Sequence, residues 1–411
     1  MVWFLFCIRI VECDMNNSND LYTEILPGIY RVSLHDMTVQ QGVNRIQIFI
    51  IKGSPAVHDG RSLMIDAGFK DQGCYQKLKK ALASLEIPLD QLDLYLTHRH
   101  HDHSGLAETF AAEGVHLFMN PAEERHPYDC LSYRVSDDSQ RAQTKVMRWV
   151  GITPDHTPYA WENFLRFSKR VKDHGEWALA VSGFPYTPVK EGDLFCYGDY
   201  RFRSIPLKGH TYGQIGLIEE EKHILFTADQ LIHGISPIVV TTYPDEHLLE
   251  GMFASLRKIK EEYSAWTIIP SHGEIIQDVR ADVDSIVYSY LNKSTVALEF
   301  LKARASACRA ETLAEGKSGS RNSRAEDEID DGHQPQELTV RQVAQAIYRM
   351  EDQPEDEAIF FSYKMLITKT FSLLEYLHDE GFVRRIDRDG VLYWSAVEAK
   401  GEESRVAGVS E

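Results

Sequence analysis

Short stretches of the chain alternate between hydrophobic and polar residues or run apolar for four to six positions. Alternation with a period of two is typical of a half-buried β-strand, and a continuous apolar run is typical of a strand buried on both faces. Leucines recur at helical spacing between Cys74 and Leu85 with lysines on the other side, which predicts an amphipathic surface helix. We predict strands at residues 28–34, 46–51, 63–65, 92–96, 115–119, 202–207, 224–227 and 266–270.

Five of these strands end in polar residues with metal-binding chemistry, flanked by small residues that let the backbone approach a centre closely. The strand at 92–96 leads into a dense motif with the pattern H-x-H-x-D-H. The motif residues are His98, His100, Asp102 and His103, and the other four strand ends carry Asp66, His210, Asp229 and His272. We expect all of them at one edge of a sheet.

Imidazoles and carboxylates packed this densely repel and desolvate one another unless they face a shared cation. Alternate residues of an extended chain point the same way, so we expect His98, His100 and Asp102 to converge, with His103 turning towards a second point nearby. Nitrogen and oxygen ligands of this mixture suit zinc, iron or manganese. The alternative interpretation is an exposed polar loop that happens to be rich in histidine.

The ordered set of motifs resembles the five signature motifs of the metallo-β-lactamase superfamily, from about residue 25 to 290. The resemblance implies an α/β (α+β) fold, an αββα sandwich with a two-metal site at one edge. It implies that Asp229 bridges two divalent ions, most simply zinc, and that Asp66 orients a ligand or a metal-bridging hydroxide; Asp66 and Asp102 are the catalytic candidates. The implied first metal is held by His98, His100 and His210, and the second by Asp102, His103 and His272.

Residues that differ between branches of this superfamily narrow the expected activity. True β-lactamases carry Cys or Ser where this chain has Asp229, and oxygen-reducing flavodiiron relatives carry Glu where it has His100. Residues 209–213 read G-H-T-Y-G and resemble the GHTxG stretch of glyoxalase-II-like enzymes. The resemblance therefore implies hydrolysis of a thioester or related ester. A phosphodiesterase or endoribonuclease of the same fold, and a non-catalytic metal-binding regulatory protein, are the alternatives.

Composition and charge restrict the expected partners. The chain has 411 residues and a formal net charge of -18, which disfavours a general affinity for nucleic acid or anionic membrane. Its six cysteines lack C-x-x-C spacing, which fits free thiols in a reducing, cytoplasmic compartment. The apolar segment at Met1–Val11 is shorter than the about 20 residues that span a bilayer, so we expect no membrane role. Met15 is an alternative start.

The hydrophobic pattern and the local composition of the sequence predict five segments along the chain. The catalytic domain contains a helical insertion rich in Arg, Lys and aromatic residues, and a stretch poor in apolar residues predicts a flexible linker. The segments are an N-terminal extension (1–20), the catalytic domain (21–290, with the insertion at 121–190), a helix and linker (291–338), a winged-helix-like domain (339–398) and a tail (399–411).

The insertion has two interpretations. As a lid over the active site, it would bring basic side chains to the substrate and favour a small anionic acyl compound. As a plain helical pair, it would bury its aromatics and leave its basic residues in solvent. The candidate substrate contacts are Tyr212, Arg141, Arg148 and Arg166.

The C-terminal segment predicts two helices and a hairpin. Thr339 caps the first helix, which runs to Met350, the second runs from Tyr363 to Asp379, and Asp389-Gly390 marks the hairpin turn. This order resembles a winged helix, which also ends several glyoxalase-II-like proteins. Seven basic residues stand against eleven acidic ones between 339 and 398, a poor balance for reading phosphates. We expect packing against the catalytic domain, or a homodimer contact.

Overall fold

The computed structural model describes residues 21–35, 45–124, 144–174, 184–241, 243–317, 337–350 and 357–397. The predicted N-terminal extension, Arg141, the tail and most of the predicted linker lie outside these described residues, and the division into five segments stays a prediction.

Seven strands form the first sheet, in the order in which they occur along the chain. Neighbours are antiparallel up to β4 and parallel from β4 onward. The helix α1 (Gln72–Ser84) makes the crossover that a parallel pairing of β4 and β5 requires. The strands are β1 (Thr23–Leu26), β2 (Ile29–His35), β3 (Arg45–Ile51), β4 (Ser62–Ile65), β5 (Leu92–Leu96), β6 (His116–Met119) and β7 (Thr187–Pro188).

Five strands form the second sheet, in the order β12-β11-β10-β9-β8. Only the pair β11 and β12 is parallel, and α6 (Leu248–Glu262) makes the crossover between them. The strands are β8 (Leu194–Tyr197), β9 (Tyr200–Pro206), β10 (Ile215–Glu219), β11 (Ile224–Ala228) and β12 (Thr267–Pro270).

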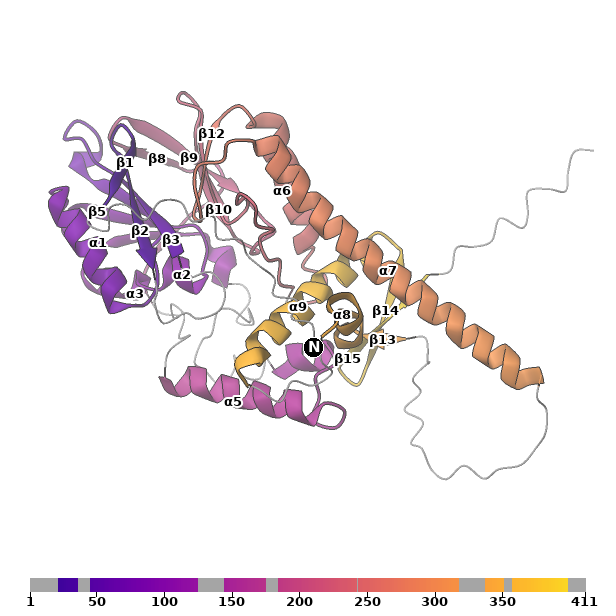
Figure 1. The fold of residues 1–411 in the computed structure, drawn as a ribbon. Coiled ribbons are helices and arrows are strands. Elements are labelled where there is room, and N and C mark those ends of the chain that lie inside the picture. The colour runs from indigo at the N-terminus through magenta and orange to yellow at the C-terminus, as the bar shows by residue number, and fades with distance from the viewer. Residues whose placement is uncertain are drawn as a thin grey trace, which may run out of the picture.

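The two sheets pack face to face between outer layers of helices (Figure 1). Aromatic residues such as Phe49 and Phe226, whose ring centroids lie 5.2 Å apart, fill the space between the sheets. Leu78 of α1 and Phe110 of α3 (Ala107–Ala112) cover the outer face of the first sheet, and Leu256 of α6 helps to cover that of the second. The αββα sandwich is therefore confirmed.

The strand ends meet at one edge, as predicted. Asp66 follows β4 and Thr97 follows the neighbouring parallel strand β5, so the Thr97 amide donates to the Asp66 carboxylate at 2.8 Å. The sheets are joined at this edge, where the Ile215 amide donates to the Thr97 carbonyl at 3.0 Å and the Gln47 amide donates to the Ser271 carbonyl at 2.8 Å.

The H-x-H-x-D-H motif is not extended throughout, and this corrects the alternation argument. The chain is extended at His100 and then forms a helical turn, α2 (His101–Ser104), in which the amides of His103 and Ser104 donate to the His100 carbonyl. Asp102 therefore does not share a strand face with His98 and His100. Gly105 and Leu106 separate α2 from α3. A Cβ on Gly105 would lie 2.3 Å from the Lys70 amide nitrogen.

The helix α7 (Val279–Lys317) extends as far as residue 317 into the segment 291–338, for which a helix followed by a flexible linker was predicted. Residues 304–317 continue the helix. They lack an apolar stripe but are rich in Ala, Arg and Glu, which have high intrinsic helix propensity. No described helix combines the length and the apolar character required to cross a membrane.

Residues 337–350 and 357–397, termed the C-terminal module, contain the predicted helices and hairpin. Thr339 and Gln342 form a capping box at the start of the first helix, and Asp389 and Gly390 turn the hairpin with positive φ angles. The winged-helix interpretation itself stays a prediction. The elements are β13 (Leu338–Thr339), α8 (Val340–Tyr348), α9 (Glu357–Asp379), β14 (Val383–Arg388) and β15 (Val391–Ala396), with sheet order β13-β15-β14.

The helices of the insertion, residues 144–149 and α5 (Pro158–His174), share a hydrophobic core with the C-terminal module. Phe164 and Phe167 of α5 belong to the same cluster as Phe360 of α9 and Trp394 of β15. The insertion and the C-terminal module thus build a second core beside the sandwich.

Candidate metal centre

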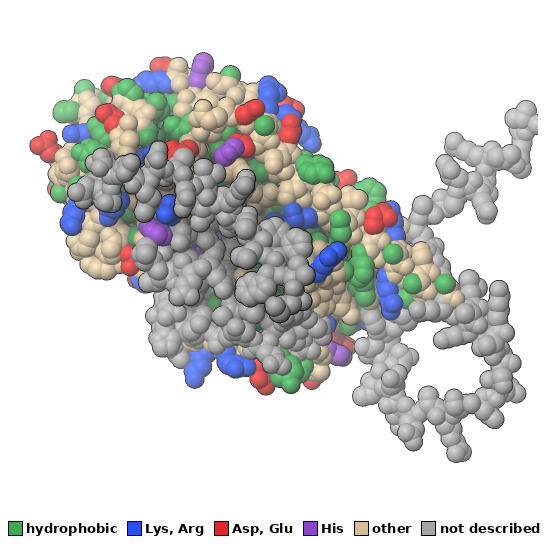
Figure 2. Space-filling model, in the orientation of Figure 1, with side chains coloured by type: hydrophobic (Ala, Val, Ile, Leu, Met, Phe, Trp, Pro, Cys, Tyr) green, Lys and Arg blue, Asp and Glu red, His purple; other side chains and the backbone are tan. Residues whose placement is uncertain are grey.

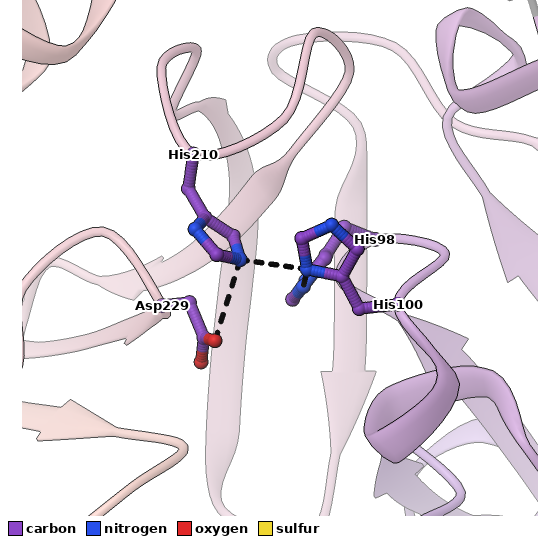
Figure 3. Close-up of side chains that lie close together, drawn as sticks. All are labelled: His98, His100, His210 and Asp229. Carbon is purple, nitrogen blue, oxygen red and sulfur yellow. Dashed lines mark hydrogen bonds and ion pairs between the residues drawn. The ribbon is translucent and has the colours of Figure 1, made fainter. Parts of the chain in front are cut away.

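All seven side chains predicted to bind metal are buried at the edge where the strand ends meet. They form two neighbouring groups, and within each group potential ligand atoms lie within 4.8 Å of one another. One group is His98, His100, His210 and Asp229 (Figure 3), and the other is Asp102, His103 and His272.

Three imidazole nitrogens converge in the first group. Nε2 of His98 lies 3.0 Å, and Nε2 of His210 lies 2.7 Å, from Nδ1 of His100 (Figure 3). Nδ1 of His210 donates to the carbonyl of Ile238 at 2.8 Å, which leaves the lone pair on Nε2. One proton on His100 cannot bond to both neighbours, whereas a cation accepts all three lone pairs.

A glycine lets the loop that carries His210 approach α6. Gly209 has a φ of +146°, and a Cβ on it would lie 2.4 Å from Cα of Met252. The small residue noted before His210 in the sequence therefore serves close backbone packing.

In the second group, hydrogen bonds fix the two imidazoles with their lone pairs turned inward. Nδ1 of His272 donates to the carbonyl of Arg45 at 2.6 Å, and Nδ1 of His103 donates to the carboxylate of Asp66 at 2.7 Å. Both Nε2 atoms are left as acceptors, which is the tautomer that binds a metal.

These acceptors face carboxylates instead of donors. Nε2 of His272 lies 3.3 Å from oxygens of both Asp102 and Asp229, and Nε2 of His103 lies 3.4 Å from Oδ1 of Asp229. Within the described part of the chain, both Nε2 atoms and Asp229 Oδ1 are buried without a hydrogen-bond partner. A divalent cation satisfies such orphaned acceptors, so the residues fit the implied metals.

Asp229 lies between the two groups. Its Oδ1 faces His103 and His272, while its Oδ2 lies 3.4 Å from Nε2 of His210. This is the position that the predicted bridging role requires.

The two groups differ in their affinity for protons. Burial lowers the pKa of His100 to about 4, and burial with the charge of His100 lowers the pKa of His210 to about 3. Burial also opposes a charge on His272, but the carboxylates of Asp229 and Asp102 outweigh it and raise the pKa to about 10. Metal binding at the second group therefore displaces protons, whereas the first group offers neutral imidazoles.

Asp66 contacts the second group directly and the first group through Thr97. Its carboxylate accepts from the Thr97 amide and hydroxyl as well as from His103. The Thr97 hydroxyl also lies 3.0 Å from Nδ1 of His98, so a proton on that nitrogen leaves Nε2 free for a metal. Asp66 is thus placed to orient His103 directly and His98 through Thr97, and its role towards a bound metal stays a prediction.

Glu123 is a site residue that the sequence analysis missed. It lies in the short helix η3 (Pro121–Glu124), and its carboxylate accepts from the amide of Arg99, the hydroxyl of Thr211 and the amide of Gly213, at 2.9, 2.7 and 2.7 Å. It joins the loop of His98 and His100 to the loop of His210. Its position just after β6, at the same edge as the other strand ends, was the available signal.

The predicted substrate contacts have identifiable neighbours. The Tyr212 ring centroid lies 4.4 Å from Lys208 Nζ, the Arg148 guanidinium lies 5.8 Å from the Trp161 ring centroid, and Arg166 pairs with Glu162 on α5 at 3.5 Å. Arg141 lies outside the described residues. Their contact with a substrate stays a prediction.

Two curated proteins show related sequences. Probable metallo-hydrolase YqjP of Bacillus subtilis (strain 168) is 22% identical over 256 residues, which cover 59% of this chain and 71% of that protein. Hydroxyacylglutathione hydrolase GloC of Haemophilus influenzae is 24% identical over 214 residues, which cover 51% of this chain and 79% of that protein.

Two solved structures share the fold over almost the whole chain. A beta-lactamase domain protein from Burkholderia ambifaria aligns with a TM-score of 0.64 and 18% identity, covering 92% of this chain and 94% of that one. A metallo-beta-lactamase family protein from Thermus thermophilus aligns with a TM-score of 0.60 and 17% identity, covering 91% and 100%.

A family profile also matches the chain. Residues 46–272 match the metallo-beta-lactamase superfamily, and this range is more than half of the chain and includes every predicted metal ligand. The chain belongs to the metallo-beta-lactamase superfamily.

Proposed function

We propose that the protein is a binuclear metal-dependent hydrolase that cleaves a thioester or related ester. The observation that carries the proposal is the position of Asp229, whose two carboxylate oxygens face a three-imidazole group on one side and the Asp102, His103 and His272 group on the other. Members of this superfamily are generally metal-dependent hydrolases, and the ligand set here is complete.

Residues around the two groups of potential ligands orient the imidazoles and exclude water from them. Two divalent cations, when bound, supply Lewis acidity and a water whose pKa is lowered towards neutrality. Carbonyl groups of Arg45 and Ile238 and the carboxylate of Asp66 keep three of the imidazoles in the ligating tautomer. Burial excludes bulk water from the ligand atoms and strengthens their interaction with a cation.

Two observations support a thioester among the possible substrates. The G-H-T-Y-G stretch at 209–213 carries His210 into the site, and a relative of the chain is named a hydroxyacylglutathione hydrolase. The net charge of -18 weighs against a nucleic-acid substrate, and Figure 2 shows Lys and Arg intermingled with Asp and Glu over the described part of one face.

The test measures metal content and hydrolysis on the same purified full-length chain. We expect close to two metal ions per chain after loading with zinc, iron or manganese, with turnover of S-lactoylglutathione or an acyl-CoA. We expect no turnover of bis(p-nitrophenyl) phosphate or single-stranded RNA. Cleavage confined to the phosphodiesters would replace the proposal with the nuclease alternative, and two metals without any hydrolysis would favour a regulatory protein.

Paired histidine variants connect the activity to this site. His210→Ala removes one of the converging nitrogens and should abolish turnover with loss of metal. His233→Ala is the matched control, because its exposed imidazole bonds to Asp282 at 2.9 Å and belongs to neither group of potential ligands. Equal activity in both variants would place the chemistry elsewhere.

A further inference from the structure

The orientation of His210 depends on a backbone carbonyl. Nδ1 of His210 donates to the oxygen of Ile238 at 2.8 Å, and this bond turns Nε2 towards His100 and Asp229. The position of the backbone around residue 238 therefore determines the direction in which Nε2 of His210 points.

The backbone around residue 238 belongs to neither a helix nor a strand, so no regular backbone hydrogen bonds of a helix or sheet hold it in place. Its polar groups bond instead to two buried side chains on distant helices. The Tyr290 hydroxyl of α7 donates to the Pro237 carbonyl at 2.5 Å and accepts from the Val239 amide at 3.0 Å. The Ser372 hydroxyl of α9 donates to the Val239 carbonyl and accepts from the Thr241 amide, both at 2.9 Å.

The contact with α9 continues along one face of that helix. Ser372, Glu375 and Asp379 are spaced by three and four residues and so lie on the same face. Glu375 accepts from the Asp245 amide at 2.9 Å, and Asp379 pairs with Nδ1 of His247 at 2.7 Å. We term residues 237–247, described apart from residue 242, the strap.

An ion-paired arginine fixes the middle of this contact. Arg385 of β14 donates to Glu375 at 2.6 and 2.7 Å and to Asp245 at 3.0 Å. The strap is therefore held by the C-terminal module at successive points, while its first residues hold a metal ligand of the sandwich.

We propose that Ser372, together with Tyr290, is a positioning residue for His210. The C-terminal module thereby helps to orient a ligand of the metal site, because it holds the strap in place. The inference rests on the proposed function in one respect, that His210 binds a metal. Loss of the Ser372 hydroxyl leaves the Val239 carbonyl and the Thr241 amide without this partner. The backbone at residue 238 can then shift, and Nε2 of His210 no longer points towards His100 and Asp229.

The test compares hydroxyl deletions on α7 and α9 in the full-length chain. The variants are Ser372→Ala, Tyr290→Phe and their combination. The control is Thr368→Val, which deletes another buried hydroxyl of α9 that bonds to the carbonyls of Lys364 and Met365 in its own helix. Metal affinity is measured by chelator competition, and cobalt(II) absorption reports the coordination of each site.

We expect the double variant to bind one of its two metals about tenfold or more weakly, with an altered cobalt spectrum, because partners that orient ligands have effects of this size. The other metal and the Thr368→Val control should keep wild-type affinity. Unchanged metal affinity and spectrum in all three test variants, with only a lowered thermal midpoint, would overturn the inference by showing a merely structural role.

Failure of this inference is distinguishable from failure of the proposed function. Metal affinity requires no substrate, so a chain that binds two metals and hydrolyses nothing would overturn the proposed function alone. A His210→Ala variant that binds both metals as tightly as wild type would overturn the positioning role, whatever the enzyme hydrolyses.

Discussion

Nδ1 of His103 donates a 2.7 Å hydrogen bond to Oδ2 of Asp66, joining the residue that follows β4 to the helical turn that follows β5. Both side chains are almost wholly buried. The bond fixes the tautomer of His103 and turns its Nε2 towards Asp102 and Asp229. Asp66 thereby acts on the metal site without being one of the clustered ligands.

Asp66→Asn should weaken metal binding at the second group. The amide keeps the shape of the side chain but removes the negative charge that His103 bonds to, so we expect metal affinity to fall by about 10–100-fold and kcat to fall with it. Chelator competition measures the first effect. Asp71→Asn, at the N-cap of α1, is the control and should keep wild-type affinity. Equal affinities in both variants would contradict the role assigned to Asp66.

Glu123→Ala should destabilise the protein and loosen the first group. The substitution leaves the donors on Arg99, Thr211 and Gly213 without their acceptor, and we expect the free energy of unfolding to fall by roughly 2 kcal/mol or more. Urea denaturation and metal analysis measure the two effects. Glu124→Ala removes the neighbouring carboxylate and should retain both metals; a similar metal loss in both variants would argue against a specific role of Glu123.

Lys369→Met should change how stability depends on pH. Burial and the nearby charge of Lys293 lower the pKa of Lys369 to about 8. Between this value and an unfolded pKa of about 10.4, the unfolded chain binds more protons, so the free energy of unfolding of the wild type rises with pH through this window. The cost of the buried charge is full below pH 8 and disappears above the window.

The variant lacks this titration, so its advantage over the wild type should be greatest near pH 7, at about 3 kcal/mol, and should vanish towards pH 10.4. Denaturation at both pH values measures the change. Lys80→Met, on the exposed face of α1, should show no such trend. A pH-independent difference for Lys369→Met would contradict the lowered pKa.

Ser104→Ala should leave turnover largely intact. The Ser104 hydroxyl is buried within hydrogen-bonding distance of the carbonyls of Arg99 and His100, so it stabilises the motif loop. We expect the free energy of unfolding to fall by about 1 kcal/mol, with kcat within a few-fold of wild type. An inactive variant with full metal content would show that the hydroxyl acts in the reaction.

The sequence predicted those parts of the site in which local pattern and chemistry coincide. Apolar runs that end in His or Asp placed Asp66, His210, Asp229 and His272 at one edge, because the ends of neighbouring strands meet there. The role of Asp102 could not be derived from alternation, since the helical turn of α2 depends on hydrogen bonds to the His100 carbonyl that no periodicity shows.

Long-range contacts limited the remaining predictions. Glu123 contacts Gly213, which is 90 residues away, and Ser372 contacts Val239, which is 133 residues away. Ser372 carries no local signature, and the only local signal for Glu123 was its position just after β6. The insertion was expected either as a lid or as a plain helical pair with buried aromatic residues. Its aromatic residues are buried in a core shared with Phe360 and Trp394, and only tertiary packing decides this pairing.

The helix α7 contributes residues to two hydrophobic cores and so links their unfolding. Val283 and Ile286 belong to the core beneath the second sheet, and Ala297 and Leu301 belong to the core shared by the insertion and the C-terminal module. One continuous rod, about 58 Å long at 1.5 Å per residue, thus supplies residues to both cores (Figure 1). Loss of either core exposes apolar residues of this helix, so the stabilities of the two halves of the molecule are coupled through α7.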